Sequence, residues 1–429
     1  METSTENRSS QSNENKSNIL VDVLGPCLDN KQLRVKLINL PSQPTKLAST
    51  PMHIRMHQLQ SIRELYVPTA QIEYLATYTD RAIRQSYIQV NPSNPKTWTN
   101  IFEQRDLSNG MENSVRPITI FGESGTGKSA GVRNFLSIYG EQVHLHKKVQ
   151  MMSSGVPQLV WLQANMPVSG RAEDLVVNLM QALDKALRST RFDAIIRSEK
   201  RDATLMLEAW SEVARSHFLG VLYLDDAHYL FNEELNKICQ EVEATNKTKK
   251  GHKTKSALEA VRRISEEWGI PIIMTGTPDI QTNLYAKSAD MVWFQGCTHL
   301  AMHQIVAGED QFFRETFFPI LCRYQWVKKP IACTHEFASL VLMLSGGIYQ
   351  IIITLWIAAH RVAFEEGRDE LCSADFMRAA TTYLTPLKMA TEALRLNDHQ
   401  KLSRFEDLLD HGHQTWKALD FISNYSVTG

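Results

Sequence analysis

A glycine-rich octapeptide in the first half of the chain has the residues and the spacing needed to bind a polyphosphate. It fits the pattern G-x-x-x-x-G-K-[ST], in which glycines let the backbone curl so that N–H groups point at phosphate oxygens. The pattern predicts that Lys128 binds the β- and γ-phosphates of ATP and that the Ser129 hydroxyl ligates Mg²⁺. The residues predicted to bind the nucleotide are Gly122, Glu123, Ser124, Gly125, Thr126, Gly127, Lys128 and Ser129.

Two consecutive carboxylates follow an apolar run further along the chain. Val221–Leu224 has the composition of a buried strand, and Asp225 and Asp226 come directly after it. Ligands of open α/β sheets bind beyond the carboxyl ends of the strands. We therefore predict that Asp225 holds Mg²⁺, directly or through water, and that Asp226 orients the attacking water. The alternative is that this acidic pair caps the next helix.

A third polar position follows the apolar run Ile272–Met274. Thr277 is the first candidate for a side chain that contacts the γ-phosphate or the attacking water, and Thr275 is the second. The alternative is that the threonine only begins the Gly-Thr-Pro turn and has no catalytic role.

Two basic features are candidates for contact with DNA phosphates. Residues 247–255 contain no acidic residue and include Lys247, Lys249, Lys250 and Lys253. Arg171 lies in a loop after the second predicted strand. Lysine-rich loops and single arginines are more often only solvated. Because neither stretch has interleaved aromatic residues for base stacking, any contact would follow the duplex backbone.

These residues need a sheet to position them. Short apolar runs predict five strands, at 117–121, 159–162, 219–224, 270–274 and 291–294. The segments between them have helical periodicity, for example 175–187, and Ser256 with Glu259 forms a capping box before another helix. Alternating strands and helices predict an α/β fold with a parallel five-stranded sheet between helices. The helical pattern after Gly308 predicts a C-terminal helical lid.

Composition restricts the class of protein. The 429 residues are enough for about two to three domains. Apolar residues make up 43% and the net charge is −1, which excludes a polybasic protein. No uncharged apolar run approaches the about 18 residues of a membrane span, and the N-terminus lacks a secretory signal. The cysteines form no C-x-x-C pair and are interpreted as buried thiols. We expect a protein of the cytoplasm that does not bind membranes.

The pattern along the chain predicts five segments. A polar start followed by short apolar runs indicates a disordered or loosely ordered arm, and the helical and strand patterns divide the rest. The expected segments are an arm at 1–50, a helical N-terminal extension at 51–110, a nucleotide-binding core at 111–300, a helical lid at 301–400 and a tail at 401–429.

Taken together, the sequences GESGTGKS, LYLDDAHYL and IPIIMTGTPDI resemble the AAA+ ATPases of the TnsC/TniB family. These are ATP-dependent target-selection regulators of transposons with multi-subunit transposases. The resemblance runs from about Thr50 to about Ala393. Its more specific part is Trp268-Gly269-Ile270-Pro271 before Gly276-Thr277-Pro278, together with Ser345-Gly346-Gly347-Ile348.

The resemblance implies an AAA+ core that binds double-stranded DNA with ATP and assembles into a homo-oligomeric ring or helical filament. It also implies two partners, a target-selection protein of TniQ or TnsD type and the transposase subunits. By position, Lys128 and Ser129 match the family's phosphate loop, and Asp225 and Asp226 match its acidic pair. Thr277 matches the first sensor. The alternatives are an oligomerising signalling or defence ATPase and an origin-loader-like AAA+ protein, which would normally end in a winged helix.

Three departures from the family pattern bear on the rate of hydrolysis. Asp226 stands where the family usually has glutamate. Residues 275–307 contain no arginine, and Lys287 is the nearest cation to the expected arginine finger. Residues 345–359 contain no arginine or lysine that could act as a second sensor. We therefore expect slow ATP hydrolysis that a partner stimulates, with Arg314 and Arg323 as reserve candidates for the finger.

Overall fold

The computed structural model describes residues 18–88, 90–103, 116–147, 149, 155–198, 201–231, 257–278, 292–294, 296–305 and 311–396. The chain divides into two compact units, each assembled from several segments. Unit 1 comprises Met1–Asp29, Leu75–Thr119 and Leu136–His299, and unit 2 comprises Asn30–Tyr74, Ile120–Phe135 and Leu300–Gly429. These units differ from the five segments expected from the sequence, because both draw on the N-terminal region.

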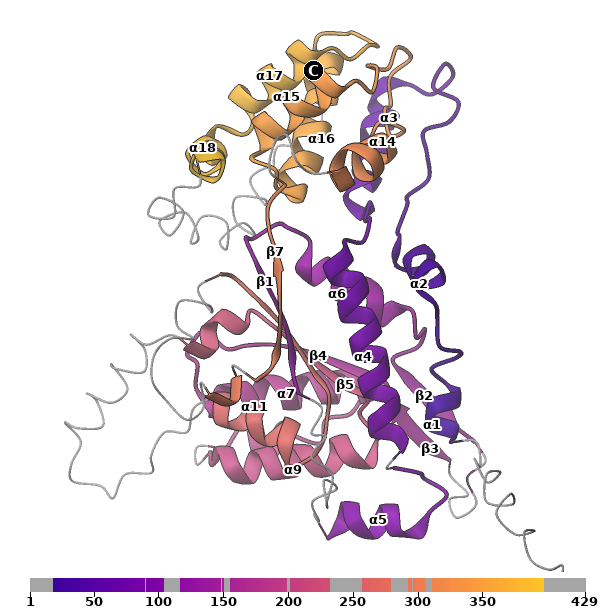
Figure 1. Cartoon of the computed structure of the whole chain (residues 1–429), viewed down its shortest axis with the longest axis vertical. Coiled ribbons are helices and arrows are strands. Elements are labelled where there is room, and N and C mark those ends of the chain that lie inside the picture. The colour runs from indigo at the N-terminus through magenta and orange to yellow at the C-terminus, as the bar shows by residue number, and fades with distance from the viewer. Residues whose placement is uncertain are drawn as a thin grey trace, which may run out of the picture. The chain divides into compact units, whose positions relative to one another are not determined.

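Five strands form one sheet in the order β4-β5-β6-β1-β7. Figure 1 labels β1, β4, β5 and β7. They are β1 Ile118–Gly122, β4 Trp161–Asn165, β5 Val221–Asp225, β6 Ile272–Gly276 and β7 Thr298–Met302. β4, β5 and β6 are parallel, with Trp161 opposite Val221 and Leu222 opposite Ile272. All residues of β1 and β6 are buried, as expected for inner strands covered on both faces. The prediction of a parallel five-stranded sheet with flanking helices is confirmed.

The prediction for the fifth strand was wrong. Val292–Phe294 is helical, and the fifth strand is β7 at the end of the sheet. A short apolar run does not distinguish a strand from a buried helical turn, whereas an edge strand such as β7 mixes polar and apolar residues. An antiparallel hairpin of β2 (Val143–His146) and β3 (Val156–Leu159) was not predicted.

Unit 1 places helices against the sheet. α7 lies against β4 and also contacts α9 and α11. The helical periodicity at 175–187 predicts one apolar face with four leucines. Three of them, Leu175, Leu179 and Leu183, are fully buried, whereas Leu187 at the end of α7 is half-buried. The helices of this unit are α1 Ile19–Asp22, α5 Pro95–Phe102, α7 Ala172–Leu187, α8 Asp193–Ile196, α9 Ala203–Ser216, η2 Ala227–Phe231 and α11 Ala257–Glu266. α4 Ala70–Ile88 and α6 Lys128–Ser137 have residues in both units.

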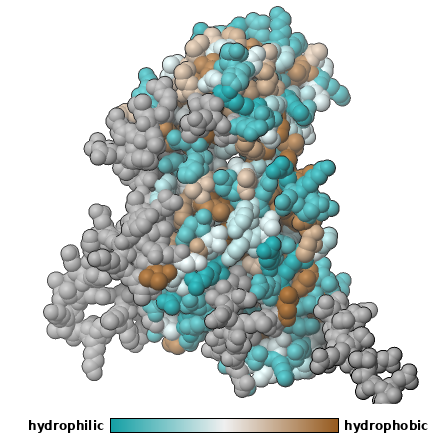
Figure 2. Space-filling model, in the orientation of Figure 1, coloured by the Kyte–Doolittle hydropathy of each residue, from teal (hydrophilic) through white to brown (hydrophobic). Residues whose placement is uncertain are grey.

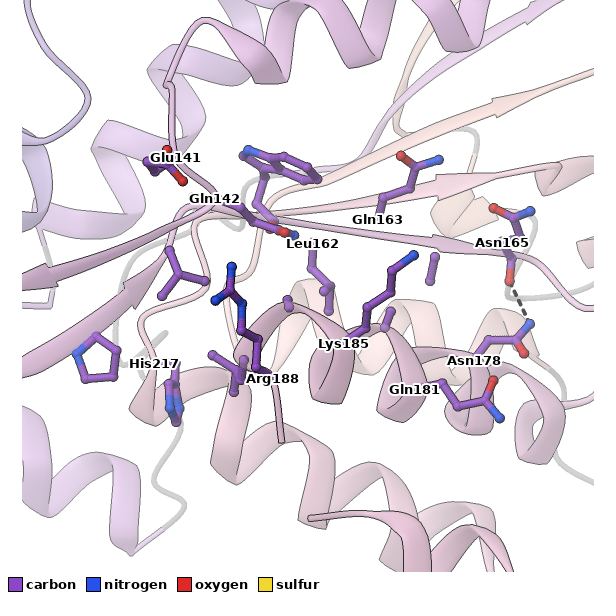
Figure 3. Close-up of a pocket in the computed structure, with 17 residues that line it drawn as sticks. Glu141, Gln142, Leu162, Gln163, Asn165, Asn178, Gln181, Lys185, Arg188 and His217 are labelled. Carbon is purple, nitrogen blue, oxygen red and sulfur yellow. Dashed lines mark hydrogen bonds between the residues drawn. The ribbon is translucent and has the colours of Figure 1, made fainter. Parts of the chain in front are cut away.

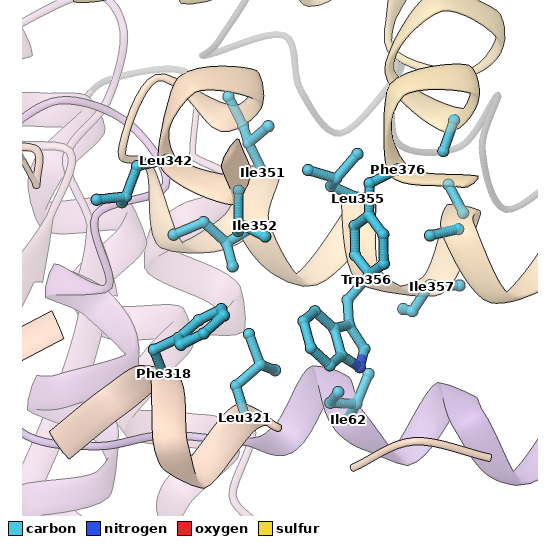
Figure 4. Close-up of a cluster of buried hydrophobic side chains, with 14 of the residues drawn as sticks. Ile62, Phe318, Leu321, Leu342, Ile351, Ile352, Leu355, Trp356, Ile357 and Phe376 are labelled. Atoms are coloured by element: carbon cyan, nitrogen blue, oxygen red, sulfur yellow. The ribbon is translucent and has the colours of Figure 1, made fainter. Parts of the chain in front are cut away.

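Unit 2 is helical after β7, as predicted for the lid. Its helices are α2 Asn30–Leu37, α3 Met52–Leu59, η1 Gln60–Glu64, η3 Phe313–Phe317, α14 Phe318–Leu321, α15 His335–Ser345, α16 Tyr349–Glu365, α17 Ser373–Thr382, η4 Thr385–Leu387 and α18 Lys388–Leu396. Side chains of α16 such as Leu355 and Trp356 lie among Phe318, Phe376 and Ile62 (Figure 4). This apolar cluster joins segments from both ends of the chain into one core.

Polar groups buried in this core are hydrogen-bonded. The Trp356 indole donates to the Tyr324 carbonyl at 2.7 Å. The His360 ring accepts the Trp326 N–H at 3.1 Å and lies 2.8 Å from the Trp356 carbonyl, so Nδ1 carries the proton. Burial lowers the pKa of His360 to about 4, which keeps the ring neutral at pH 7.

The segment 18–50 was expected to be loosely ordered, but the structure shows it docked on the rest of the chain. Leu20 and Leu37 are fully buried. The Asn18 side chain donates to the Tyr87 and Val90 carbonyls at 2.7 and 3.0 Å. Isolated leucines in a polar segment are a weak signal, yet each buried leucine stabilises docking by about 2 kcal/mol. Residues 1–17 and the tail at 401–429 lie outside the described residues.

Some large apolar side chains are exposed, among them Ile88, Phe102 and Val292. The described residues on the face in Figure 2 are mostly hydrophilic, with hydrophobic ones in scattered groups. No single described helix meets the length and hydropathy of a membrane span; α15 and α16 meet them only together, with a bend of 109°. The cysteines differ from the expectation: of the five described, all free, only Cys297 is buried, and Cys27, Cys333 and Cys372 are exposed.

Candidate functional site

The predicted phosphate loop follows β1 and leads directly into α6. Its turn is closed by Thr126, whose N–H and hydroxyl donate to the Glu123 carbonyl at 3.3 and 2.8 Å. Gly125 and Gly127 have φ values of +79° and +93°, which side chains rarely permit. The glycines at these positions are therefore required for the curl of the backbone.

Lys128 is the first residue of α6, and its side chain folds back over the loop. Its ammonium donates to the carbonyls of Gly122 and Glu123 at 2.6 and 2.8 Å, and the residue is only 8% exposed. Ser129 follows in the first turn of the helix. A buried ammonium beside a helix N-terminus makes this loop electropositive, which suits a phosphate group.

Two residues that were not predicted hold the loop within unit 2. The Gln350 N–H, at the start of α16, donates to the Gly125 carbonyl at 3.1 Å. A Cβ on Gly125 would lie 2.9 Å from the Gln350 side chain, and one on Gly131 would lie 2.4 Å from the Tyr66 hydroxyl. The only sequence signal for the first contact was Ser345-Gly346-Gly347-Ile348, which ends just before α16. Nothing in the sequence indicated Tyr66.

The acid pair lies at the carboxyl end of β5 in unit 1. The four apolar residues of this strand are fully buried, and Asp225 and Asp226 are half-buried. The Asp226 N–H donates to Asp225 Oδ1 at 3.1 Å. Asp226 has φ +59°, a left-handed conformation that is uncommon for a residue with a side chain. The chain therefore turns sharply into η2 at Asp226.

Of the two candidate threonines, Thr275 is the one that contacts the acid pair. Its hydroxyl donates to Asp225 Oδ1 at 2.5 Å, so the Tyr223 hydroxyl, 3.0 Å away, donates to Thr275. Thr275 is fully buried on β6. Thr277 lies just after β6 and is buried, but among the described residues its side chain has no hydrogen bond. The chain Tyr223–Thr275–Asp225 fixes the position of one carboxylate oxygen.

The candidate DNA contacts remain predictions. Arg171 lies before α7 and is 43% exposed, but its guanidinium is 3.4 Å from Glu173 and 3.5 Å from Asp174. These two carboxylates partly neutralise the charge of Arg171 and so weaken its attraction for a phosphate. Lys247, Lys249, Lys250 and Lys253 lie outside the described residues, as does Lys287.

The reserve arginines differ in their surroundings. Arg314 lies on η3 with a nitrogen 3.3 Å from the His335 ring. Arg323 follows α14, is exposed and has no ion-pair partner in the described part of the chain. Of the two, Arg323 is the one whose guanidinium is presented to solvent.

Mg²⁺ would be held by oxygen ligands. The Ser129 hydroxyl and the Asp225 carboxylate are both hard oxygen donors of the kind that Mg²⁺ takes, with nucleotide phosphates and water as further ligands. The described residues contain no group of three or more His, Cys, Asp or Glu side chains that could hold a metal by themselves. Each side chain is thus a donor of the kind that Mg²⁺ takes together with a nucleotide, and their binding of one ion stays a prediction.

The chain was compared with protein families and with solved structures. A family model for the AAA domain matches residues 112–284. Similar solved structures include the Aeropyrum pernix ORC2 protein, at 15% identity over 71% of this chain and 66% of that one, with a TM-score of 0.37. Drosophila ORC bound to DNA is 11% identical over 94% of this chain and 89% of that one, with a TM-score of 0.36. The Thermotoga maritima RuvB Holliday junction branch migration motor is 12% identical over 77% of this chain and 76% of that one, with a TM-score of 0.33. This chain thus spans about two thirds of the Aeropyrum protein.

No curated protein matches the sequence. The AAA domain and the five-stranded sheet confirm the predicted AAA+ P-loop NTPase fold. An AAA domain indicates a nucleotide-binding ATPase.

Proposed function

We propose that the chain is an ATP-dependent, DNA-binding regulator of DNA transposition. It oligomerises on duplex target DNA and connects a target-selection protein of TniQ or TnsD type to the transposase, in the prokaryotic cytoplasm. The observation that supports the ATP-dependent step most directly is the buried ammonium of Lys128 inside a loop of the P-loop pattern. The motifs around Thr277 and Ser345, which resemble the TnsC/TniB family, support the role in transposition.

In this proposal, the hydrolytic step uses the loop that follows β1 and the acid pair at the end of β5. The loop binds the triphosphate through its N–H groups and Lys128, and Ser129 with Asp225 holds Mg²⁺. Bound Mg²⁺ offsets the negative charge that develops on the phosphates during transfer. Thr275 keeps the Asp225 carboxylate in place, and Asp226 orients the attacking water.

The assembly step is tested by electron microscopy of the purified protein with duplex DNA and a non-hydrolysable ATP analogue. We expect rings or helical filaments only when both are present. Because one subunit is nearly neutral, affinity for DNA should arise from many subunits. Each phosphate contact should add about −0.9 to the slope of log affinity against log salt concentration. The Lys128→Ala variant is the matched control and should not assemble. Equal assembly without nucleotide would contradict the ATP-dependent mechanism.

The role in transposition is tested by phosphate release. We expect slow release with protein and DNA alone and faster release after the transposase subunits are added. If the transposase has no effect while assembly remains ATP-dependent, the signalling or defence ATPase becomes the better interpretation. Phosphate release could instead be fast without any partner and be abolished by Arg323→Ala or Arg314→Ala. That result would show that an arginine finger already completes the site.

A further inference from the structure

A cavity of about 1060 Å³ lies along the outer edge of the sheet in unit 1 (Figure 3). Its walls come from β4, from α7 and from the residues that begin β2, with His217 at one end. None of the residues assigned to nucleotide or magnesium lines it. The cavity therefore needs an explanation of its own.

The strand that borders the cavity, β4, is at the end of the sheet and has β5 as its one neighbour in it, so the other edge of β4 faces away from β5. Main-chain bonds along a strand alternate between its two sides. The Val221 N–H donates to the Val160 carbonyl at 3.1 Å, and the Met166 N–H donates to the Asp225 carbonyl at 2.9 Å. The main-chain groups of the even-numbered residues of β4 thus form hydrogen bonds with β5. The main-chain groups of Trp161, Gln163 and Asn165 point to the opposite edge, away from β5.

Side-chain amides occupy part of this outer edge. Gln142 donates to the Trp161 carbonyl and Asn178 to the Asn165 carbonyl, each at 2.9 Å. Figure 3 shows these amides on either side of Gln163. They take the places that N–H groups of a further strand would occupy, and no strand of the described residues pairs here. The Trp161 indole nitrogen, also at the cavity, is buried without a hydrogen-bond partner in the described part of the chain.

The cavity wall is positively charged. Lys185 and Arg188, from the C-terminal end of α7, extend toward β4 in Figure 3. Both are exposed and have no ion-pair partner among the residues that the structure describes. Among the described residues that line the cavity, Glu141 is the only one with a carboxylate. Two cations face one anion, so a ligand with carboxylates is complementary to this wall.

We propose that this cavity binds an extended acidic peptide segment of another protein, which adds to β4 as a further strand. The peptide backbone displaces the amides of Gln142 and Asn178 and pairs with the odd-numbered residues of β4. Every second side chain then faces α7, where carboxylates meet Lys185 and Arg188. A helical partner would leave the outward main-chain groups of β4 without partners, which is why a strand fits this edge. This site does not depend on the proposed function in transposition.

The probes are fluorescein-labelled octapeptides measured by fluorescence anisotropy with the full chain. The acidic probe alternates Val with Glu, and the matched neutral and basic probes replace every Glu by Gln or Lys. We expect the acidic probe to bind about ten-fold or more tightly than the basic one. Two further acidic probes carry N-methyl groups on the odd or on the even residues. Because only alternate N–H groups face β4, one of them should lose binding and the other should keep it.

Charge reversal tests the wall. Lys185→Glu with Arg188→Glu should weaken the acidic probe about ten-fold and strengthen the basic one. Lys96→Glu, a reversal at an exposed lysine of α5 outside the cavity, should change neither. Unaltered thermal unfolding and nucleotide affinity would show that the variants are folded. Three results would overturn the assignment: no saturable binding of the acidic probe up to about 1 mM, equal loss with both N-methyl patterns, or equal affinity for acidic and basic probes.

Discussion

In the phosphate loop, the ammonium of Lys128 is held by carbonyl oxygens five and six residues before it, whereas the carboxylate of Asp225 is held by a threonine 50 residues after it. The loop depends on backbone curvature and on the glycines that permit it. The acid pair depends on two neighbouring strands keeping their register. The loop should therefore be sensitive to local changes, and the acid pair to changes in another strand.

The largest effect is expected at the acid pair. Asp226→Asn keeps the size of the side chain but removes the carboxylate that orients water, so hydrolysis should fall about 100-fold. Nucleotide binding should persist, because the phosphate loop is unchanged, and assemblies on DNA should live longer. Steady-state phosphate release and a nucleotide titration measure the two quantities. Undiminished release would move the role to another carboxylate.

A change in the loop should have the opposite signature. Lys128→Ala removes a charge-assisted contact with the phosphates worth about 1.5–3 kcal/mol, so nucleotide affinity should fall ten-fold or more. A titration with labelled nucleotide measures this, and Lys96→Ala is the control for loss of a lysine elsewhere. Equal affinities of wild type and Lys128→Ala would show that the loop is not the binding site.

The remote partner of Asp225 provides the sharpest test of the difference between the two regions. Thr275→Val removes the hydroxyl that donates to Asp225 and leaves a similar volume, so Mg²⁺-dependent hydrolysis should fall about ten-fold. Thr277→Val should change it less than about two-fold, because its hydroxyl contacts neither carboxylate in the described structure. If Thr277→Val has the larger effect, Thr277 is the sensor, as the sequence first indicated.

The smallest effect is expected on the pH dependence of stability, through His360 on α16. This is also the helix whose Gln350 contacts the phosphate loop. Because burial lowers the pKa of His360 to about 4, a proton binds the unfolded chain but not unit 2 between pH 6.5 and 4. Stability is present above pH 6.5 and is lost as the pH falls, by about 1 kcal/mol at pH 5.5. Urea unfolding at pH 7.5 and 5.5 measures this. His360→Gln keeps a donor and an acceptor but cannot titrate, so an unchanged pH dependence would contradict this origin.

Several elements could be predicted because their signals are local. The inner strands β1, β5 and β6 were found from short, mostly apolar runs, since their residues are almost all buried. The edge strand β7 was missed because it mixes polar and apolar residues, and four of its five residues are only half-buried. The docking of segment 18–50 was missed because its few leucines are buried only by surfaces formed elsewhere in the chain.

Local patterns in the sequence were enough to predict the phosphate loop, the acid pair and the order of strand and helix around them. These features follow from backbone dihedrals and hydrogen bonds over a few residues, which a short pattern specifies. Three features became visible only in the folded chain. They are the hydrogen bond from Thr275 to Asp225, the hydrogen bond from Gln350 to Gly125, and the outer edge of β4 beside Lys185 and Arg188. Each of these depends on which segments become neighbours, and that choice is made by packing of the whole core, which no local pattern encodes.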